Sequence, residues 1–362
     1  AVNESVNLIR AAKLGSAAGF ANAVLRRATR EADYHPAAEI EDPIEALAVE
    51  TSHPPWLVER WIEQVGFAET RALARANNDA APTAFRFTAK TGQQAEAIID
   101  ELRAQGAEVR PAPVARNGWR VSRADNEGAG SNIRAVPAPA RVLLRKLSAE
   151  GLIYFQDEGS QLVAELLRAQ SDERVLEVCA APGSKATLIA ALARQATVVA
   201  GDIYEHRART IKEFATQQQA GNVWPVVYDA TRPLPFPADS FDRVLVDAPC
   251  SGTGTLRHNP EIRWRLQPAD IAELAGKQKS ILGNAAAMVR EGGALVYSTC
   301  SLETEENEAV ILDFCETHPD FENAPSDGEG GAIWLTDTGA VRTWPHKDEV
   351  DGFFVTVLRR KS

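Results

Sequence analysis

Residues 174–203 read RVLEVCAAPGSKATLIAALARQATVVAGDI, and this stretch decides the fold. It begins with an apolar run, continues through a turn of small residues and a helical pattern, and ends in a second apolar run. Similar runs recur downstream: VWPVVYDA (223–230), DRVLVDAP (242–249), ALVYSTC (294–300) and FFVTVL (353–358). Near-continuous apolar strands that alternate with helices indicate a parallel sheet covered on both faces. The sequence therefore predicts a doubly wound α/β domain over residues 151–362.

The residues before 151 carry two other patterns. Apolar positions at helical spacing predict a helical segment over residues 1–78, as in GFANAVLRRATRE (19–31) and PPWLVERWIEQVG (54–66). A strand, a helix and a strand are then expected in turn from residues 80–92, 93–113 and 118–122. Residues 124–141 are rich in Gly, Ala, Pro and Asn and resemble a linker. We thus expect a small α+β module with its linker over residues 79–150.

Composition limits the class of protein. The chain has 362 residues, of which 44% are hydrophobic and 25% charged, a balance typical of globular proteins. No apolar run approaches the roughly 18 residues that a membrane span needs, so we expect a cytoplasmic protein with no membrane partner. The net charge of −11 argues against nucleic acid. Residues 110–146 nevertheless hold eight basic side chains, which favour either an RNA-binding segment or a solvated charged face: Arg110, Arg116, Arg120, Arg123, Arg134, Arg141, Arg145 and Lys146.

The ends of the predicted strands carry candidate ligand-binding residues. After RVLEV comes CAAPGSKAT (179–187), where small residues let the backbone approach a ligand at the start of a helix. Asp202 follows Gly183 at a spacing of about 20 residues, at which a carboxylate takes ribose hydroxyls in nucleotide-binding folds. Asp229 and Asp247 end the next two strands, although any one of these Asp residues could simply cap a helix. Since neither GxGxxG nor GxxxxGK[ST] occurs, we expect a nucleoside ligand without a pyrophosphate, such as S-adenosylmethionine.

Four cysteines, at 179, 250, 300 and 315, lack the CxxC pairs of zinc sites, so we expect free thiols and no metal. Cys179 and Cys315 are interpreted as small buried hydrophobes. Cys250 and Cys300 instead follow neighbouring predicted strands among Gly, Ser and Thr.

Two such thiols suit methylation at carbon 5 of cytosine. A thiolate that adds to carbon 6 makes carbon 5 nucleophilic, and a second thiol can then remove the proton from carbon 5. Asp247 could hydrogen-bond the amino group and N3 of the ring and so select cytosine over uracil.

Four segments, CAAPGSK, GDIYEHR, DAPCSGTGTLRHNPEIRW and STCSLETEENE, together resemble the RNA cytosine-5 methyltransferase family. The resemblance extends through QDEGSQL (156–162) and RTWPHKDEVDGFF (342–354), and it implies a Rossmann-like methyltransferase sheet. It further implies a nucleophile at Cys300, a release residue at Cys250, and base contacts from Asp247 with Lys185 nearby. For S-adenosylmethionine it implies a set of binding residues made up of Cys179, Ala180, Ala181, Pro182, Gly183, Ser184, Lys185, Asp202, Arg207, Asp229 and Asp247.

The upstream half is similar to bacterial members that methylate 16S ribosomal RNA, in which a helical domain like the antitermination factor NusB precedes a small RNA-binding module. Only the later portion of such a domain is matched, and since the chain begins with Ala1, we expect that part of it has been removed. FRFT replaces the usual Arg-x-Asn pattern, and PGSK replaces PGGK. Ribosomal RNA is the expected substrate, with transfer RNA as an alternative. Two other functions fit less well. A nicotinamide dehydrogenase would require a GxGxxG turn, which the sequence lacks, and a non-catalytic RNA-binding protein would leave both cysteine motifs unexplained.

Overall fold

The computed structural model describes residues 2–30, 35–123, 136–324, 335–336 and 338–362. The chain divides into two compact units, Ala1–Gln64 and Val65–Ser362. The first unit is helical, as predicted, with helices α1 (Val2–Ala11), α2 (Ala18–Arg30), α3 (Pro43–Thr51) and α4 (Pro55–Val65). Asp42 caps α3 by accepting from the backbone N–H groups of Ile44 and Glu45. Leu47, Ala48 and Val58 pack together between α3 and α4.

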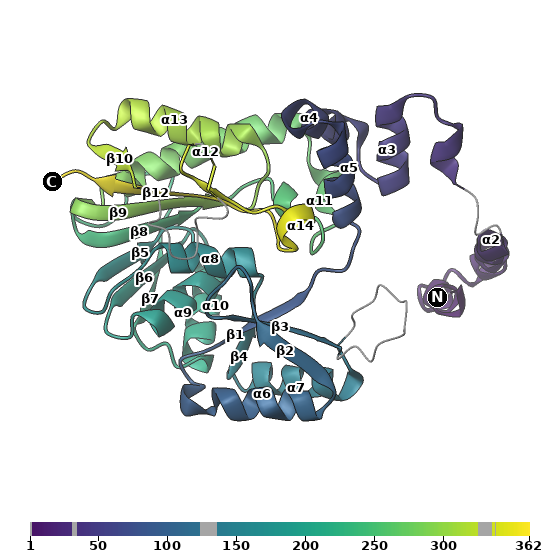
Figure 1. The fold of residues 1–362 in the computed structure, drawn as a ribbon, viewed down its shortest axis with the longest axis horizontal. Helices are drawn as coiled ribbons and strands as arrows, with labels where there is room; N and C mark the ends of the chain where they lie inside the picture. The colour runs from purple at the N-terminus through teal and green to yellow at the C-terminus, as the bar shows by residue number, and fades with distance from the viewer. Residues whose placement is uncertain (1, 31–34, 124–135, 325–334, 337) are drawn as a thin grey trace. The chain divides into compact units, whose positions relative to one another are not determined.

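The second unit begins with α5 (Phe67–Ala76) and a small antiparallel sheet. Its strands lie in the order β2-β3-β1-β4 and have the bounds β1 Thr83–Phe87, β2 Ala107–Pro111, β3 Gly118–Arg123 and β4 Ile153–Phe155. Helices α6 (Ala95–Ala104) and α7 (Ala138–Ala149) bury Leu102 and Leu144 against Phe85 of this sheet. Figure 1 shows both helices along the same side of the four strands.

The small module contains two strands that the sequence pattern did not predict. Strand β2 lies where we expected the end of a helix, because Gly106 at φ +80° ends α6 and the alternation of buried Ala107 and Val109 with exposed side chains follows. Strand β4 lies beyond the predicted boundary at residue 150 and pairs with β1, Phe85 opposite Phe155. Helix α7 begins inside the predicted linker. The division at 78 and 150 stays a prediction.

A larger sheet of eight strands forms the centre of the second unit. Six of its strands correspond to the apolar runs: β5 (Arg174–Glu177), β6 (Thr197–Asp202), β7 (Val223–Val227), β8 (Phe241–Asp247), β9 (Val289–Thr299) and β12 (Phe354–Arg360). The order is β10-β12-β9-β8-β5-β6-β7, with the short strands β10 (Phe321–Asn323) and β11 (Val341–Arg342) both paired to β12. Strands β5 to β9 are parallel, but β12 runs antiparallel to β9.

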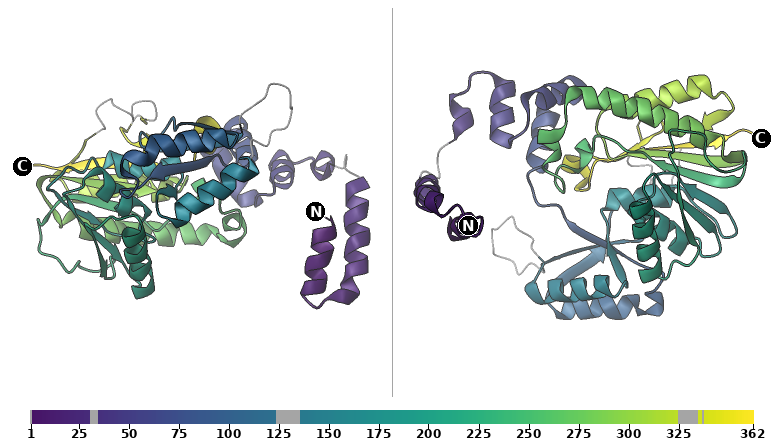
Figure 2. Two further views of the ribbon diagram at one scale, coloured as in Figure 1. Left: turned by 90° about the horizontal axis from the view of Figure 1, so that it is seen from below. Right: turned by 180° about the vertical axis from the view of Figure 1, so that it is seen from behind.

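Helices cover both faces of this sheet, which confirms the doubly wound prediction. Helices α8 (Glu158–Leu166), α9 (Ser184–Leu192) and α10 (Glu205–Gln217) pack on one face, and α12 (Pro268–Ala286) and α13 (Glu308–Thr317) on the other. Successive side chains of β8 alternate between the two cores, with Leu245 in the first and Val244 and Val246 in the second. Figures 1 and 2 show the strands between these two layers.

The strand order reverses beside β5, because the chain proceeds to β6 and β7 on one side and to β8 and β9 on the other. In open α/β sheets, ligands bind at the carboxyl ends of strands at such a switch point. Among the described residues, no helix has the length and apolarity that crossing a membrane would need.

Candidate active site

The turn between β5 and α9 brings the predicted cofactor loop, Cys179 to Lys185, against the end of β6. The backbone N–H of Ala180 donates to the carbonyl of Gly201 at 2.7 Å. Gly183 precedes α9 at φ +104°, and a Cβ there would lie 3.2 Å from Ile211 in α10. The sequence needs Gly at this position for its backbone conformation and for the close approach of α10. Pro182, which is exposed, and Ser184, which is half-buried, flank this buried glycine.

Asp202, at the end of β6, is tied to this loop. Its Oδ2 accepts from the backbone N–H of Ala181 at 3.3 Å, and its Oδ1 accepts from that of Tyr204 at 3.2 Å. Arg207 lies 3.4 Å from Asp202 Oδ1 and donates to the carbonyl of Ala181 at 3.4 Å. The structure thus brings together three of the predicted cofactor residues from β6, α10 and the loop.

Asp229 lies beyond the end of the neighbouring strand β7. Hydrogen bonds from the side chain and backbone of Thr231 lower the pKa of its carboxyl group, with a further contribution from Arg232. Its local contacts are those of a turn, and its proposed role toward a cofactor stays a prediction.

Cys250 and Cys300 meet at the ends of β8 and β9. Their Sγ atoms are 3.4 Å apart, within hydrogen-bond distance for sulfur. Asp247 ends β8 and accepts two hydrogen bonds. Lys185 Nζ of α9 donates to its Oδ2 at 2.6 Å, and Ser298 Oγ of β9 donates to its Oδ1 at 2.8 Å. The four residues predicted to be catalytic therefore lie together as two pairs, Cys250 with Cys300 and Lys185 with Asp247.

The electrostatics of this group differ between its members. The hydrogen bond with Cys300, burial and the charge of Cys300 together raise the pKa of the Cys250 thiol well above its ordinary value. Burial opposes the charge on Lys185, but Asp247 outweighs burial through its charge and its hydrogen bond, so the pKa of Lys185 is raised. Lys185 therefore stays a cation, and Cys300 lies within its electrostatic reach.

The sequence analysis did not single out Glu306, which holds the two cysteine loops together. Its buried carboxylate accepts from the backbone N–H and the hydroxyl of Ser251, next to Cys250, and from the hydroxyl of Ser301, next to Cys300. Gln278 of α12 donates to the same carboxylate at 2.9 Å. Of the three carboxylates in ETEE (303–306), Glu303 and Glu306 are both buried, and the sequence gave no signal that Glu306 would be the one to contact both cysteine loops.

Glu177, at the end of β5, is a second residue that the sequence analysis missed. Burial raises the pKa of its carboxyl to about 8, although Lys185 opposes this shift, and its Oε2 has no hydrogen-bond partner among the residues that the structure describes. A charged residue within the apolar run RVLEVC was the available signal. An unpaired carboxylate oxygen close to Lys185 of the loop fits a ligand that carries positive charge, as S-adenosylmethionine does on its sulfonium and amino groups.

The remaining cysteines are only partly accessible. Cys179 packs against the core on the α12 face, and burial raises the pKa of its thiol to about 12. Burial also raises the pKa of Cys315, which contacts the same core. Both are free thiols, as is every cysteine of the chain.

Three further polar side chains cluster near the site. His258 Nδ1 lies 2.9 Å from Asp351 Oδ2, and Asp157 faces both of them at a distance that a metal ion could bridge. The guanidinium of Arg257 lies 3.7 Å from Asp351 Oδ1, so a positively charged side chain already neighbours this cluster. The expectation of no metal stays a prediction.

Comparisons with known proteins agree with this fold and site. Residues 164–359 match the family model described as 16S rRNA methyltransferase RsmB/F, and residues 53–126 match a ferredoxin-like domain of RsmF/B-like methyltransferases. A probable ribosomal RNA small subunit methyltransferase B from Bacillus subtilis is 35% identical over 368 residues, which cover 100% of this chain and 78% of the relative. Its counterpart from Pasteurella multocida is 33% identical over 375 residues, which cover 99% of this chain and 75% of the relative.

The fold is also that of a solved structure, NSun6 from Pyrococcus horikoshii with SFG, at a TM-score of 0.71 and 20% identity over 85% of this chain and 98% of that one. The sheet and these matches define an S-adenosylmethionine-dependent RNA methyltransferase. More narrowly, the chain belongs to the 16S rRNA methyltransferase RsmB/F family.

Proposed function

We propose that this chain transfers a methyl group from S-adenosylmethionine to carbon 5 of a cytosine in small-subunit ribosomal RNA, through a covalent bond between Cys300 and carbon 6. The observation that carries this proposal is the 3.4 Å separation of the two sulfurs beside the Lys185–Asp247 pair. A single thiol would suffice for many reactions. Two thiols in contact suit a reaction in which one adds to a ring and the other takes a proton from it.

The cofactor residues fit S-adenosylmethionine by charge. The loop from Cys179 to Lys185, together with Glu177, Asp202, Arg207 and Asp229, would hold it, with Asp202 available to the ribose hydroxyls. When bound, S-adenosylmethionine supplies an electrophilic methyl group. The carboxylates match its positive charges, and no Lys or Arg other than Lys185 and Arg207 belongs to the proposed set.

Cys300 is assigned the nucleophilic role because of its surroundings. The cation of Lys185 lies within electrostatic reach of Cys300, at the end of the strand beside Asp247. The Cys300 thiolate forms a bond to carbon 6, and the electron pair of the ring double bond becomes available at carbon 5, which takes the methyl group. Asp247, held by Lys185 and Ser298, faces the base edge that distinguishes cytosine from uracil.

Cys250 is assigned the release step. It removes the proton from carbon 5, the double bond re-forms, and the bond between carbon 6 and Cys300 breaks. The causes that raise the pKa of Cys250 include a hydrogen bond with Cys300 and the charge of Cys300. Both causes disappear once Cys300 is bonded to carbon 6, so the Cys250 thiol becomes easier to ionise at the step that needs it.

Two observations support ribosomal RNA as the substrate: the description of the family model and the names of the relatives from Bacillus subtilis and Pasteurella multocida. The catalytic residues themselves do not distinguish ribosomal from transfer RNA. We keep the cytoplasm as the expected location, because ribosomal RNA is the proposed substrate.

Paired alanine variants test the proposal. Cys300→Ala should abolish methyl transfer and form no covalent RNA complex. Cys250→Ala should still add and methylate but release its product slowly, so that a denaturing gel shows a shifted protein band carrying labelled methyl. A shifted band with Cys300→Ala alone would reverse the roles, and wild-type turnover in both variants would exclude covalent catalysis. If the wild type methylated transfer RNA but not ribosomal RNA, the assignment of ribosomal RNA as the substrate would be wrong.

A further inference from the structure

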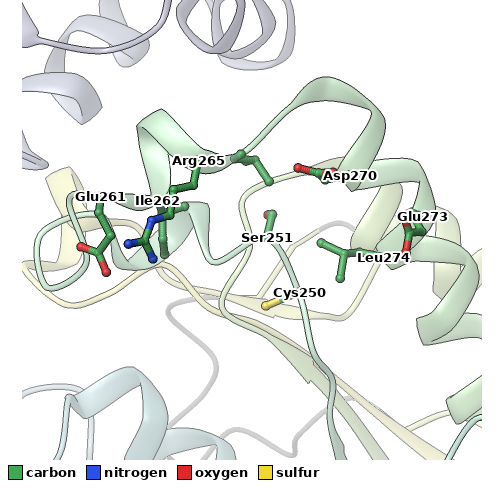
Figure 3. A pocket seen from close by; sticks show the side chains of 9 residues that line it. Cys250, Ser251, Glu261, Ile262, Arg265, Asp270, Glu273 and Leu274 are labelled. Atoms are coloured by element: carbon green, nitrogen blue, oxygen red, sulfur yellow. The ribbon is translucent and has the colours of Figure 1, made fainter.

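A cavity of about 330 Å³ borders Cys250 on the side formed by α11 (Ile262–Arg265) and the start of α12. Figure 3 shows Cys250 and Ser251 between its two walls, with Glu261, Ile262 and Arg265 along one wall and Asp270, Glu273 and Leu274 along the other. Cys300, Asp247 and Lys185 are not among the residues that line it. The cavity is therefore separate from the position where both sulfurs and Asp247 would contact the target base.

Cys250 belongs both to the lining of the cavity and to the pair of cysteines that would hold the target base. Because Cys250 contacts Cys300, the cavity borders the place that a cytosine held by the two cysteines would occupy. The part of an RNA chain that comes next to the target base is a neighbouring nucleotide. This position makes the cavity a candidate for that nucleotide.

The lining favours a base over the sugar-phosphate backbone. Ile262, Leu266 and Leu274 offer apolar surface for the face of a planar ring. The remaining charged groups are three carboxylates and one guanidinium, so the wall as a whole would repel a phosphate. Carboxylates are good acceptors for the amino groups of bases.

Of the four charged side chains in the lining, two already have partners and two are available to a base. Asp270 Oδ2 accepts from the backbone N–H of Gln267 at 2.8 Å, and Glu273 accepts from Lys277 Nζ at 2.6 Å. Within the described part of the chain, Glu261 and Arg265 have no side-chain hydrogen bond or ion pair, although they are one helical turn apart. The cavity therefore presents one unused acceptor group and one unused donor group on the same wall.

We propose that this cavity binds the nucleobase adjacent to the target cytosine and selects a base that has both an amino group and a ring carbonyl. Glu261 accepts from the amino group, and Arg265 donates to the carbonyl. Guanine and cytosine have both groups, whereas adenine lacks the carbonyl and uracil lacks the amino group. The inference rests on the proposed function, because it takes the position of the target cytosine from the two cysteines.

The test uses the full chain, labelled S-adenosylmethionine and transcripts of small-subunit ribosomal RNA. The methylated cytosine is first mapped, and the bases on its 5′ and 3′ sides are then varied one at a time. On one of the two sides, kcat/KM should be about tenfold higher with guanine or cytosine than with adenine or uracil, the usual effect of one mismatched base.

Two variants link this preference to the cavity. Glu261→Gln and Arg265→Gln should lower kcat/KM on the preferred transcripts toward the value for the adenine and uracil transcripts. Glu213→Gln and Lys212→Gln, which change exposed side chains of α10, are the matched controls and should keep the preference. Calorimetry with S-adenosylmethionine checks that each variant binds cofactor and is folded.

The outcomes separate the two proposals. Equal methylation of cytosine beside all four bases, or an unchanged preference in both cavity variants, would overturn the assignment of the cavity while leaving the proposed function intact. Absence of cytosine methylation by the wild type on every transcript would instead overturn the proposed function.

Discussion

Glu177 illustrates how a single buried carboxylate can be unfavourable for folding and useful for binding. Its pKa in the folded chain is about 8, above the ordinary carboxyl value of 4.5, because burial disfavours the charged form. The folded state therefore holds a proton more tightly than the unfolded state, and the free energy of unfolding falls as the pH rises from about 4.5 to about 8. A positively charged cofactor beside the carboxylate would remove this cost.

We therefore expect Glu177→Gln to have opposite effects on stability and on cofactor binding. At pH 8 the variant should be more stable than the wild type by about 1–2 kcal/mol, less than the full shift implies, since Lys185 loses an opposite charge. Its affinity for S-adenosylmethionine should fall by about 1–3 kcal/mol.

Thermal melts from pH 5 to 8, with calorimetry at pH 8, check both effects, and Glu213→Gln serves as the exposed control. Melting temperatures of wild type and variant that stay parallel across this range would contradict the pKa assignment. Unchanged affinity would remove Glu177 from the cofactor site.

At the scale of elements, Glu306 joins the loops that follow β8 and β9 to helix α12. The backbone N–H of Ser251 and the amide of Gln278 both depend on its carboxylate, and Tyr297 adds a hydrogen bond to the Glu306 carbonyl. These contacts fix both cysteine loops to one buried group. The 3.4 Å contact between the sulfurs is therefore a property of the network as well as of the two strands.

Glu306→Ala should remove the acceptor of four buried donor groups and lower the free energy of unfolding by about 2–4 kcal/mol. The rate of covalent complex formation should fall about tenfold or more, while the affinity for S-adenosylmethionine stays close to that of the wild type, because the cofactor loop follows β5. Glu306→Gln keeps an acceptor for the amide donors and should recover part of the rate. The measurement is single-turnover adduct formation by a folded variant, and a wild-type rate in Glu306→Ala would contradict the bracing role.

The sequence predicted the regular part of this architecture for a physical reason. The central strands of the large sheet, such as β5 and β8, are largely buried on both faces, so they appear as continuous apolar runs such as VLVDAP, and the candidate site residues follow those runs. The antiparallel direction of β12 was not visible, because side-chain patterning carries no strand direction. Strand β4 has three residues and was too short to recognise. The inward turn of Glu306 depends on tertiary contacts with α12, which local sequence does not encode.

For the whole molecule, the question is how a chain with a net charge of −11 would bind RNA. The basic stretch at residues 110–146 does not act as one surface. Arg120 is buried and paired with Glu158 and Glu349, and Arg134 lies outside the described residues. Arg141 and Arg145, by contrast, are exposed on α7 and line a cavity of about 320 Å³ together with the exposed Phe155.

A second cavity, of about 460 Å³, continues the basic and aromatic surface around Arg145. Tyr154 and Phe214 line it, and among the described residues of its lining Arg145 is the only charged side chain. Guanidinium groups beside exposed rings suit single-stranded RNA, since phosphates pair with the cations and bases stack on the rings. The other exposed basic residues of the stretch, Arg110, Arg116, Arg123 and Lys146, stay a solvated face in this interpretation.

Reversing both charges with Arg141→Glu and Arg145→Glu should weaken RNA binding and flatten its salt dependence. Losing two phosphate contacts lowers the slope of log K against log salt by about 1.4 for single strands. Arg103→Glu with Lys212→Glu makes the same change in net charge on α6 and α10 and should alter the slope less. Filter binding from 50 to 300 mM salt distinguishes the two. Equal changes in both double variants would mean that only net charge matters, and an unchanged slope in the α7 variant would mean that RNA binds elsewhere on the chain.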